Sequence, residues 1–394
     1  LFGLPNPGRG PQMTGTGGLT SRTFFAKEIT VSGTTGPAFG VIHDKHLVVA
    51  GASTAKNTIF YSGTNDIDSF SSTGSGSIVI EDAVVGLASF RSDLIIFCKN
   101  SIHKLVNINN SSTVAVVPIT TNVGCVNGGS IQEVGGDILF LAPDGVRTIA
   151  GTARIGDVEL SSVSSPIQSI IQSIADNINN FTVSSAVLRS KSQYRLFYNT
   201  DGTANIAAKG IIATLTNEGF QYSETQGIKA TALTSDLDLN GIEQTWHGDT
   251  DGYIYNHNEG NSFDYGGTAS NVTAAYQTPN LDFGDVGTKK TMRYVRISMS
   301  PEGAVQPTLR VRYDYEDPQI AQPLDYVLDS IPLPSIFGSG VFGANVFGAS
   351  SDPLIRQTVQ GSGHTVSFIV TSSDQQSPYT VNGLYIDYTP SGRR

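Results

Sequence analysis

The sequence predicts an all-β protein: a β-propeller of about five or more blades with one inserted amphipathic helix, followed by a C-terminal β-sandwich. Three observations lead to this prediction. Short apolar runs alternate with Gly, Asn, Asp and Ser along the 394-residue chain, which is typical of strands joined by tight turns. One strand–turn–strand pattern recurs every 43 to 57 residues, which is close to the length of a propeller blade. Only one stretch has clear helical spacing.

The clearest copy of the pattern is residues 128–150, GGSIQEVGGDILFLAPDGVRTIA. Gly135-Gly136 separates two apolar runs, and Pro143-Asp144-Gly145 turns the chain back. Asp-Gly between apolar runs is a strong hairpin signal, because glycine accepts the positive φ that a tight turn needs. This stretch therefore predicts one complete strand–turn–strand unit.

Four further copies repeat the same order of apolar strand, turn, second strand, polar turn and third strand. They cover residues 39–62, 84–106, 183–207 and 228–257. The second turns of the five copies fall at Asn57, Asn100, Asp144, Asp201 and Asp251. Residues 76–80 and 114–119 can supply fourth strands, so the propeller is predicted to span residues 37–270.

Residues 164–180, SSPIQSIIQSIADNINN, form the one clear predicted helix. Pro166 suits the first helical position, and Ser164 or Ser165 can cap it. Five isoleucines follow at i, i+3, i+4, i+7 and i+11, which gives one apolar stripe. They are Ile167, Ile170, Ile171, Ile174 and Ile178. We expect a helix inserted between blades, with this stripe packed on the propeller rim or on a neighbouring subunit.

Residues 1–36 and 271–394 flank the predicted propeller. The first segment is rich in Gly, Pro and Thr without a sustained period, which predicts an extended arm. The second segment carries longer strands, one of them predicted over Leu309–Tyr315. In Met292–Met299, for example, Val295 and Ile297 share one face and alternate with polar residues. This alternation is typical of half-buried strands and predicts a β-sandwich.

A loop at residues 336–349, IFGSGVFGANVFGA, repeats Phe-Gly every five residues. That period suits neither a helix nor a strand. Exposed aromatic side chains on a glycine-rich tether are costly in water unless they insert elsewhere. We therefore expect Phe337, Phe342 and Phe347 to plug into a neighbouring subunit or another protein. The alternative is a loop folded back on its own sandwich.

No residue pattern predicts catalysis, a cofactor or a metal site. His43-Asp44-Lys45-His46 has no second ligand cluster and indicates a polar turn. The Asp-rich stretch 248–252 with Glu259 departs from calcium-loop spacing and indicates a hairpin turn. Residues 235–246 are only loosely similar to the Asp-box of sialidase propellers, and acidic residues scattered over turns do not give the paired carboxylates of a glycosidase cleft. We predict that the protein is not an enzyme.

Composition narrows the possible partners. The net charge of −10 argues against a nucleic-acid-binding surface, which needs clustered Lys and Arg. DNA could still pass an acidic channel wall without binding to it. No run approaches 18 apolar residues, so we expect no stable membrane insertion. Cys98 and Cys125 are too few for a disulfide framework and are expected to be small buried residues.

Several stretches together resemble the nozzle (tail tubular protein B) type of tail protein from short-tailed phages. They are residues 128–150 with the following helix, residues 246–267, residues 276–285 with Lys289-Lys290, the Pro301-Glu302-Gly303 turn and the Phe-Gly loop. The resemblance implies a virion structural protein of the phage tail that forms a homo-oligomeric ring, with six copies expected, around the DNA exit channel. It also implies adaptor, fibre or tailspike proteins as neighbours and genome DNA that passes without specific binding. It brings no catalytic residue.

Two other classes of function stay open. A carbohydrate-binding or glycan-degrading propeller that recognises the host surface would need Trp and Tyr residues clustered with paired carboxylates, and Trp246 is the only tryptophan. A secreted propeller that serves as a plain scaffold is the third possibility. Within the phage interpretation, the sequence does not separate a nozzle from a hub.

Overall fold

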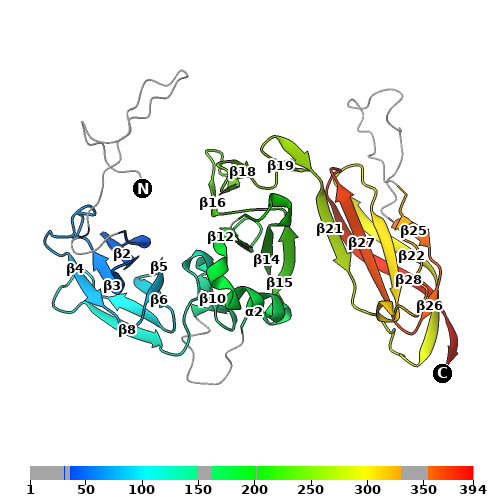
Figure 1. The fold of residues 1–394 in the computed structure, drawn as a ribbon, viewed down its shortest axis with the longest axis horizontal. Helices are drawn as coiled ribbons and strands as arrows, with labels where there is room; N and C mark the ends of the chain where they lie inside the picture. Colours follow the sequence, from blue (N-terminus) through cyan, green and yellow to red (C-terminus); the bar gives the residue numbers. More distant parts are fainter. Residues whose placement is uncertain (1–30, 32–35, 150–161, 201, 330–353, 394) are drawn as a thin grey trace, which may run out of the picture. The chain divides into compact units, whose positions relative to one another are not determined.

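The computed structural model describes residue 31 and residues 36–149, 162–200, 202–329 and 354–393, drawn as a ribbon in Figure 1. These residues form mostly antiparallel sheets with one short α-helix, which confirms the all-β prediction. Internal contacts divide the chain into unit 1, residues 1–257, and unit 2, residues 258–394. The sequence placed the division at residue 270, and the difference contains one small hairpin, β19 (Phe263–Tyr265) and β20 (Thr268–Ser270).

The described part of unit 1 contains five small antiparallel sheets, and within each sheet every strand pairs with its neighbour in sequence. The first sheet is β1 (Phe39–His43), β2 (His46–Ala52), β3 (Ala55–Tyr61) and β4 (Gly76–Val79). The second is β5 (Val84–Phe90), β6 (Asp93–Cys98), β7 (Ile102–Val106) and β8 (Ala115–Thr120). The third is β9 (Gln132–Val134), β10 (Asp137–Ala142) and β11 (Gly145–Thr148). The fourth is β12 (Thr182–Leu188), β13 (Gln193–Asn199), β14 (Lys209–Thr216) and β15 (Gly219–Gln226), and the fifth is β16 (Ala232–Leu237), β17 (Glu243–Gly248) and β18 (Ile254–Asn256).

Most of the turn predictions agree with these strands. Asn100, Asp144 and Asp251 lie between strands, and the predicted fourth strands at 76–80 and 114–119 are present as β4 and β8. The prediction for Asn57 was wrong, because this residue lies inside β3. Its side-chain Nδ2 donates to the carbonyl of Ile80 at 3.0 Å, so the asparagine holds the end of the neighbouring strand in place of a turn. Residue 201 lies outside the described residues.

The first four sheets of unit 1 share cores with their neighbours in chain order, which explains the long apolar runs in β2, β6 and β10. In β6, Leu94 and Ile96 face the core shared with the first sheet, while Ile95 and Phe97 face the core shared with the third. The rings of Phe97 and Phe140 meet there with centroids 5.3 Å apart. The alternate residues of β10 divide in the same way between the second and fourth sheets.

A pair of glycines forms the joint at which the second, third and fourth sheets meet. Gly128 and Gly129 begin the short 3₁₀ helix η1 (Gly128–Ser130). A Cβ on Gly128 would lie 2.3 Å from the carbonyl oxygen of Val85, and one on Gly129 would lie 2.2 Å from that of Val183. These contacts are far below van der Waals distance, so only glycine allows the strands to approach this closely.

The predicted helix is present but shorter than its sequence pattern. It consists of η2 (Ser165–Ile167), α2 (Gln168–Asp176) and η3 (Ile178–Asn180). Pro166 lies in the first turn as expected. Neither predicted cap forms for the α-helix: Ser165 belongs to η2, and the Ser164 hydroxyl makes no capping bond but accepts the backbone N–H of Val146 at 3.0 Å. Ser164 thereby ties the helix start to β11.

Unit 2 contains two larger sheets that share one hydrophobic core (Figure 1). One sheet has the order β21 (Val272–Gln277), β27 (Val366–Asp374), β23 (Thr308–Tyr313) and β24 (Tyr326–Val327). The other has β25 (Leu354–Thr358), β22 (Thr288–Pro301) and β26 (Ser362–Gly363), with β28 (Tyr379–Arg393) also paired to β22. Val295, Ile297 and Met299 are fully buried between the sheets, as their alternation predicted.

One predicted strand of unit 2 was too long. The sequence extended it from Leu309 to Tyr315, but β23 ends at Tyr313. Asp314, Tyr315 and Glu316 have φ values of 49°, 59° and 58°, which is a left-handed turn without glycine and is strained for such residues. The carboxylate of Asp314 helps to hold the turn, since its Oδ1 accepts the backbone N–H groups of His364 and Thr365.

Candidate functional site

The isoleucine stripe proposed as an interface packs against the chain itself. Ile171 and Ile174 are fully buried in the core formed by the third and fourth sheets. Ile167, Ile170 and Ile178 are half-buried against the same core. The most buried part of the stripe is therefore internal, and only the three half-buried residues retain surface. A role for them in contacts with another subunit remains a prediction.

The second predicted interface is the Phe-Gly loop. Phe337, Phe342 and Phe347 lie outside the described residues, so their insertion into a partner also remains a prediction.

Carboxylates considered as possible ligands are engaged by their own turns. Asp249 Oδ1 accepts the backbone N–H groups of Asp251 and Tyr253, and its Oδ2 accepts the Tyr255 hydroxyl at 2.9 Å. This is the hairpin turn expected for the 248–252 stretch. His43 and His46 are likewise separated by a two-residue turn with positive φ at Asp44 and Lys45. Among the described residues, no group of three or more His, Cys, Asp or Glu side chains could hold a metal ion.

Glu243 joins the fourth and fifth sheets. Its carboxylate accepts the backbone N–H of Arg189 at 2.9 Å and of Ser190 at 2.8 Å. Burial acts to raise its pKa, but these bonds together with that from Ser235 outweigh burial and bring the pKa of Glu243 to about 2. The residue is therefore ionised at neutral pH and is poorly suited to act as a general acid or base.

Two buried histidines form a second link between the same sheets. His257 Nδ1 lies 3.3 Å from Arg195 Nη1, and His257 Nε2 lies 2.7 Å from His247 Nδ1. Since the guanidinium only donates, His257 Nδ1 accepts and its Nε2–H donates to His247, so both rings are neutral. Burial lowers the pKa of His247 to about 4, and burial together with the charges of His247 and Arg195 lowers that of His257 to about 3.

The tip of the β16–β17 hairpin displays aliphatic side chains that the sequence analysis did not single out. Leu237, Leu239 and Ile242 are 60%, 105% and 58% exposed. Asp238 holds the tip: its Oδ1 accepts the N–H groups of Asn240 and Ile242, and its own N–H donates to the carbonyl of Ile242. The available sequence signal was the placement of apolar residues inside an Asp-Asn-Gly turn, where polar residues are usual.

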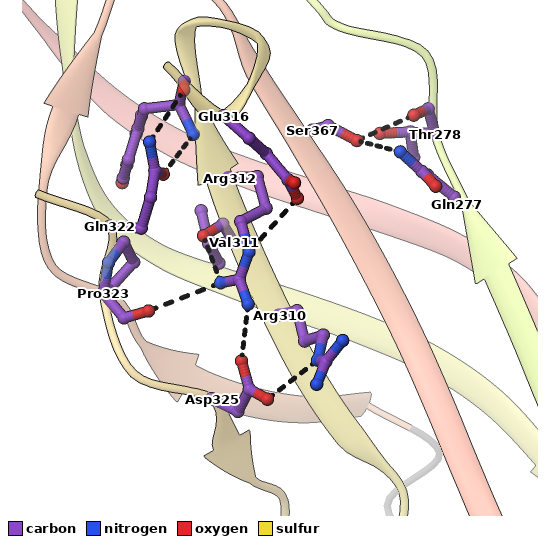
Figure 2. Close-up of polar contacts among 11 residues, drawn as sticks. Gln277, Thr278, Arg310, Val311, Arg312, Glu316, Gln322, Pro323, Asp325 and Ser367 are labelled. Carbon is purple, nitrogen blue, oxygen red and sulfur yellow. Dashed lines mark hydrogen bonds and ion pairs between the residues drawn. The ribbon is translucent and has the colours of Figure 1, made fainter. Parts of the chain in front are cut away.

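Unit 2 carries an ion-pair cluster at the edge formed by β23 and β24. Figure 2 shows Arg312 between Asp325, Glu316 and the carbonyl of Pro323. Arg312 Nη2 lies 2.9 Å from Asp325 Oδ1, and Arg310 Nε lies 2.7 Å from Asp325 Oδ2. The cluster fixes the segment that connects the two strands, and exposed apolar side chains lie on this segment or beside it: Tyr315, Leu324 and Val327.

A hollow of about 460 Å³ lies between α2 and the end of β13 in unit 1. Its lining combines two aromatic rings, hydroxyl groups, an amide and one charge of each sign. The residues used below are Ser173, Phe181, Tyr198, Asn199, Lys209 and Glu224. No local sequence pattern indicates this hollow, because its lining comes from a helix, connecting segments and three strands that only the fold brings together.

Among the described residues, no helix is long and apolar enough to cross a membrane. Cys98 and Cys125 are free and fully buried, as the sequence predicted. Burial raises the pKa of Cys98 to about 12 and that of Cys125 to about 11, so neither thiol is a reactive nucleophile at neutral pH.

Comparison with known proteins gave distant structural similarities. No protein-family model and no curated protein matches the chain. Among solved structures, an extracellular domain of a putative one-component system from B. thetaiotaomicron is similar with a TM-score of 0.31 and 10% identity over 60% of this chain. This chain spans 35% of that domain's length, and 39% of a related hybrid two-component domain from the same organism.

In two further solved structures, the similar region makes up a larger share of the other chain. One is a mutant of AofleA from Arthrobotrys oligospora, with a TM-score of 0.28 and 10% identity over 60% of this chain and 72% of that one. The other is an exo-beta-1,3-galactanase from Phanerochaete chrysosporium with beta-1,3-galactotriose, with a TM-score of 0.29 and 9% identity over 95% and 99%. Similarity at this level assigns neither a family nor a function.

Proposed function

We propose that this chain is a non-catalytic structural subunit of a bacteriophage tail, in which the five sheets of unit 1 are propeller blades and unit 2 is a β-sandwich. In this proposal the chain assembles as a homo-oligomeric ring of six copies in the virion and contacts other tail proteins. Genome DNA passes through the ring. The phage assignment derives from the sequence resemblance, and the acidic net charge of −10 suits a channel that does not retain DNA.

The observation that carries the assembly role is the rigid β16–β17 hairpin tip. Leu239 is fully exposed, and Leu237 and Ile242 lie beside it in the sequence with more than half of their surface in solvent. Apolar side chains grouped on an ordered surface are typical of protein contacts. Because Asp238 already orders the tip through hydrogen bonds, little conformational entropy would be lost on docking. We assign a second copy of the chain as its partner.

The mass of the purified protein tests this proposal. At micromolar concentration we expect an assembly near six times the 41.7 kDa of one chain, measured by light scattering after gel filtration. Leu239→Asp should reduce its mass, because a charge would be buried in the contact. Val79→Asp, at a position 69% exposed on β4, is the matched control and should leave the mass unchanged.

A monomer at every concentration would contradict the ring. The rival interpretation, a carbohydrate-binding or glycan-degrading protein for the host surface, would gain if that monomer bound or cleaved a bacterial polysaccharide. Cleavage that is abolished by one Asp or Glu substitution would overturn the non-catalytic proposal as a whole.

A further inference from the structure

The hollow beside α2 lies where the helix stops covering one face of the fourth sheet. On this face, Leu196 and Ile211 pair across β13 and β14 and are buried under the helix. One pair further along, Tyr198 lies opposite Lys209 on the same face. The apolar cover therefore ends at a point where aromatic and polar side chains come together, and the hollow of about 460 Å³ opens there. Its size is within the range of about 300–1,000 Å³ that is usual for small-molecule sites.

Asn199 gives the hollow a fixed polar wall. The residue is 4% exposed, and its Oδ1 accepts the backbone N–H of Lys209 at 3.1 Å, which sets the orientation of the amide. Its Nδ2 is buried and has no hydrogen-bond partner among the described residues. A buried donor without a partner is destabilising. The atom has no solvent-exposed surface, so a small shift of the side chain on binding is needed before it donates to a molecule in the hollow.

Two aromatic rings form an apolar wall. Phe181 and Tyr198 meet edge to face, with centroids 5.5 Å apart and an interplanar angle of 78°. Burial and the Glu224 carboxylate raise the pKa of Tyr198, so its hydroxyl keeps its proton at neutral pH. A ligand that fits here needs an apolar C–H face for the rings and hydroxyl groups for the polar wall.

The two opposite charges in the lining of the hollow disfavour the binding of ionic ligands. Lys209 and Glu224 both line the hollow and contribute opposite charges, so an anion would meet the carboxylate and a cation would meet the ammonium group. A neutral molecule can donate to one and accept from the other. From this combination we propose that the hollow binds one neutral sugar residue, which presents both a C–H face and hydroxyl groups. This inference is independent of the proposed ring assembly.

Saturation-transfer NMR on the full chain tests the proposal, with D-glucose, D-galactose, L-fucose and N-acetyl-D-glucosamine as neutral probes and D-glucuronate as the charged comparator. We expect at least one neutral sugar to bind with a Kd in the millimolar range. Ser173 is exposed on α2 at the rim of the hollow, so Ser173→Trp should fill the opening and abolish the signal. Ser223→Trp, on the exposed neighbour of Glu224 in β15, is the matched control and should retain it.

The amide has its own test. Asn199→Ala should weaken binding of the same sugar by about tenfold, because the fixed donor is lost. Ser173→Trp keeps the test decisive if the alanine variant does not fold. The proposal would be overturned if none of the four neutral sugars bound, if Ser173→Trp bound as well as the wild type, or if D-glucuronate bound more tightly than every neutral sugar.

Discussion

The two units use the same secondary structure with opposite connectivity. In unit 1 every paired strand lies next to its partner in sequence, as in the order β5-β6-β7-β8. In unit 2 the long strands have distant partners: Val272 of β21 pairs with Asp374 of β27, and Met292 of β22 pairs with Tyr388 of β28. Unit 1 therefore spreads its core over several interfaces between consecutive sheets, whereas unit 2 concentrates one core between two sheets.

This difference governs how the units should respond to damage. Local pairing makes each sheet of unit 1 dependent mainly on its neighbours, while long-range pairing makes unit 2 depend on one shared core. Trp246 is the only tryptophan and lies in unit 1. Its fluorescence therefore reports on unit 1, while far-UV circular dichroism reports on both units, and the two signals can separate their unfolding.

The largest expected effect comes from removing a central aromatic ring in each unit. Phe140 and Phe368 are both fully buried, and truncation of either to alanine should cost about 3–5 kcal/mol. In urea unfolding, Phe140→Ala should shift the Trp246 fluorescence transition, whereas Phe368→Ala should shift only a transition seen by circular dichroism. If Phe368→Ala moved the fluorescence midpoint as well, the units would unfold as one cooperative structure and the comparison would fail.

An intermediate effect is expected from acid. His247 and His257 have folded-state pKa values of about 4 and 3, below the value of about 6.5 expected when unfolded. The contribution of the two histidines to the free energy of unfolding is thus intact above pH 6.5 and is lost as the pH falls towards 4. In this range the unfolded chain binds protons that the folded chain does not bind. Each histidine should cost unit 1 up to about 1.4 kcal/mol per pH unit in this window, measured by Trp246 fluorescence in urea at a series of pH values.

The Asp249 carboxylate acts to raise the pKa of His247, which reduces the loss without changing its sign. Glu243 adds to the loss near pH 4, because its folded pKa of about 2 lies below the value of about 4.3 expected when unfolded. His257→Asn provides the control. An asparagine Oδ1 can accept from Arg195 without titrating, so this variant should flatten the pH dependence by about one proton. An unchanged slope would mean that other groups cause the acid sensitivity.

The smallest effect concerns the cluster in Figure 2. Asp325→Asn removes the charge that pairs with Arg310 and Arg312 and should cost about 1 kcal/mol, because Arg312 is only 17% exposed and loses a charge-assisted bond. The effect should appear in unit 2 alone and should shrink at high salt.

The control for that cluster is an ordinary surface pair in unit 1. Lys104 and Asp93 lie 3.2 Å apart with 37% and 38% of their side chains exposed. Asp93→Asn should change the unfolding free energy by only a few tenths of a kcal/mol. Equal losses for the two variants would show that the network in Figure 2 contributes no more than an isolated pair.

The contrast between the units also explains how much the sequence could predict. In unit 1 the Asp144-Gly145 turn and the neighbouring apolar run predicted local strands correctly, because short-range turn chemistry determines their pairing. Asn57 misled the turn prediction, since asparagine bonds a neighbouring strand as readily as it forms a turn. In unit 2 the alternation of Val295 and Ile297 predicted a buried face, but no local pattern indicates that β22 pairs with β28.

Sites that depend on several sheets could not be predicted. The His247–His257 link joins the fifth sheet to Arg195 of the fourth, and Asn199 lines its hollow opposite a helix that is distant in sequence. Each residue alone carries no local signal of its neighbour. The left-handed turn at Tyr315 is similar, because the Asp314 carboxylate helps to hold it through bonds to His364 and Thr365, which are distant in sequence. The interface assigned to Phe337, Phe342 and Phe347 remains a prediction.

The glycine joint has a consequence for how such a protein can diversify. Gly128 and Gly129 let the start of the third sheet approach β5 and β12 closely, so nearly any substitution there would alter how those three sheets meet. The last strand of each sheet lies at the opposite edge, and the described chain varies there: the third and fifth sheets have three strands, and a helix follows the third. Insertions, deletions and duplications should therefore accumulate at the last strands of the sheets. New surface can evolve there while the contacts of Gly128 and Gly129 stay constant.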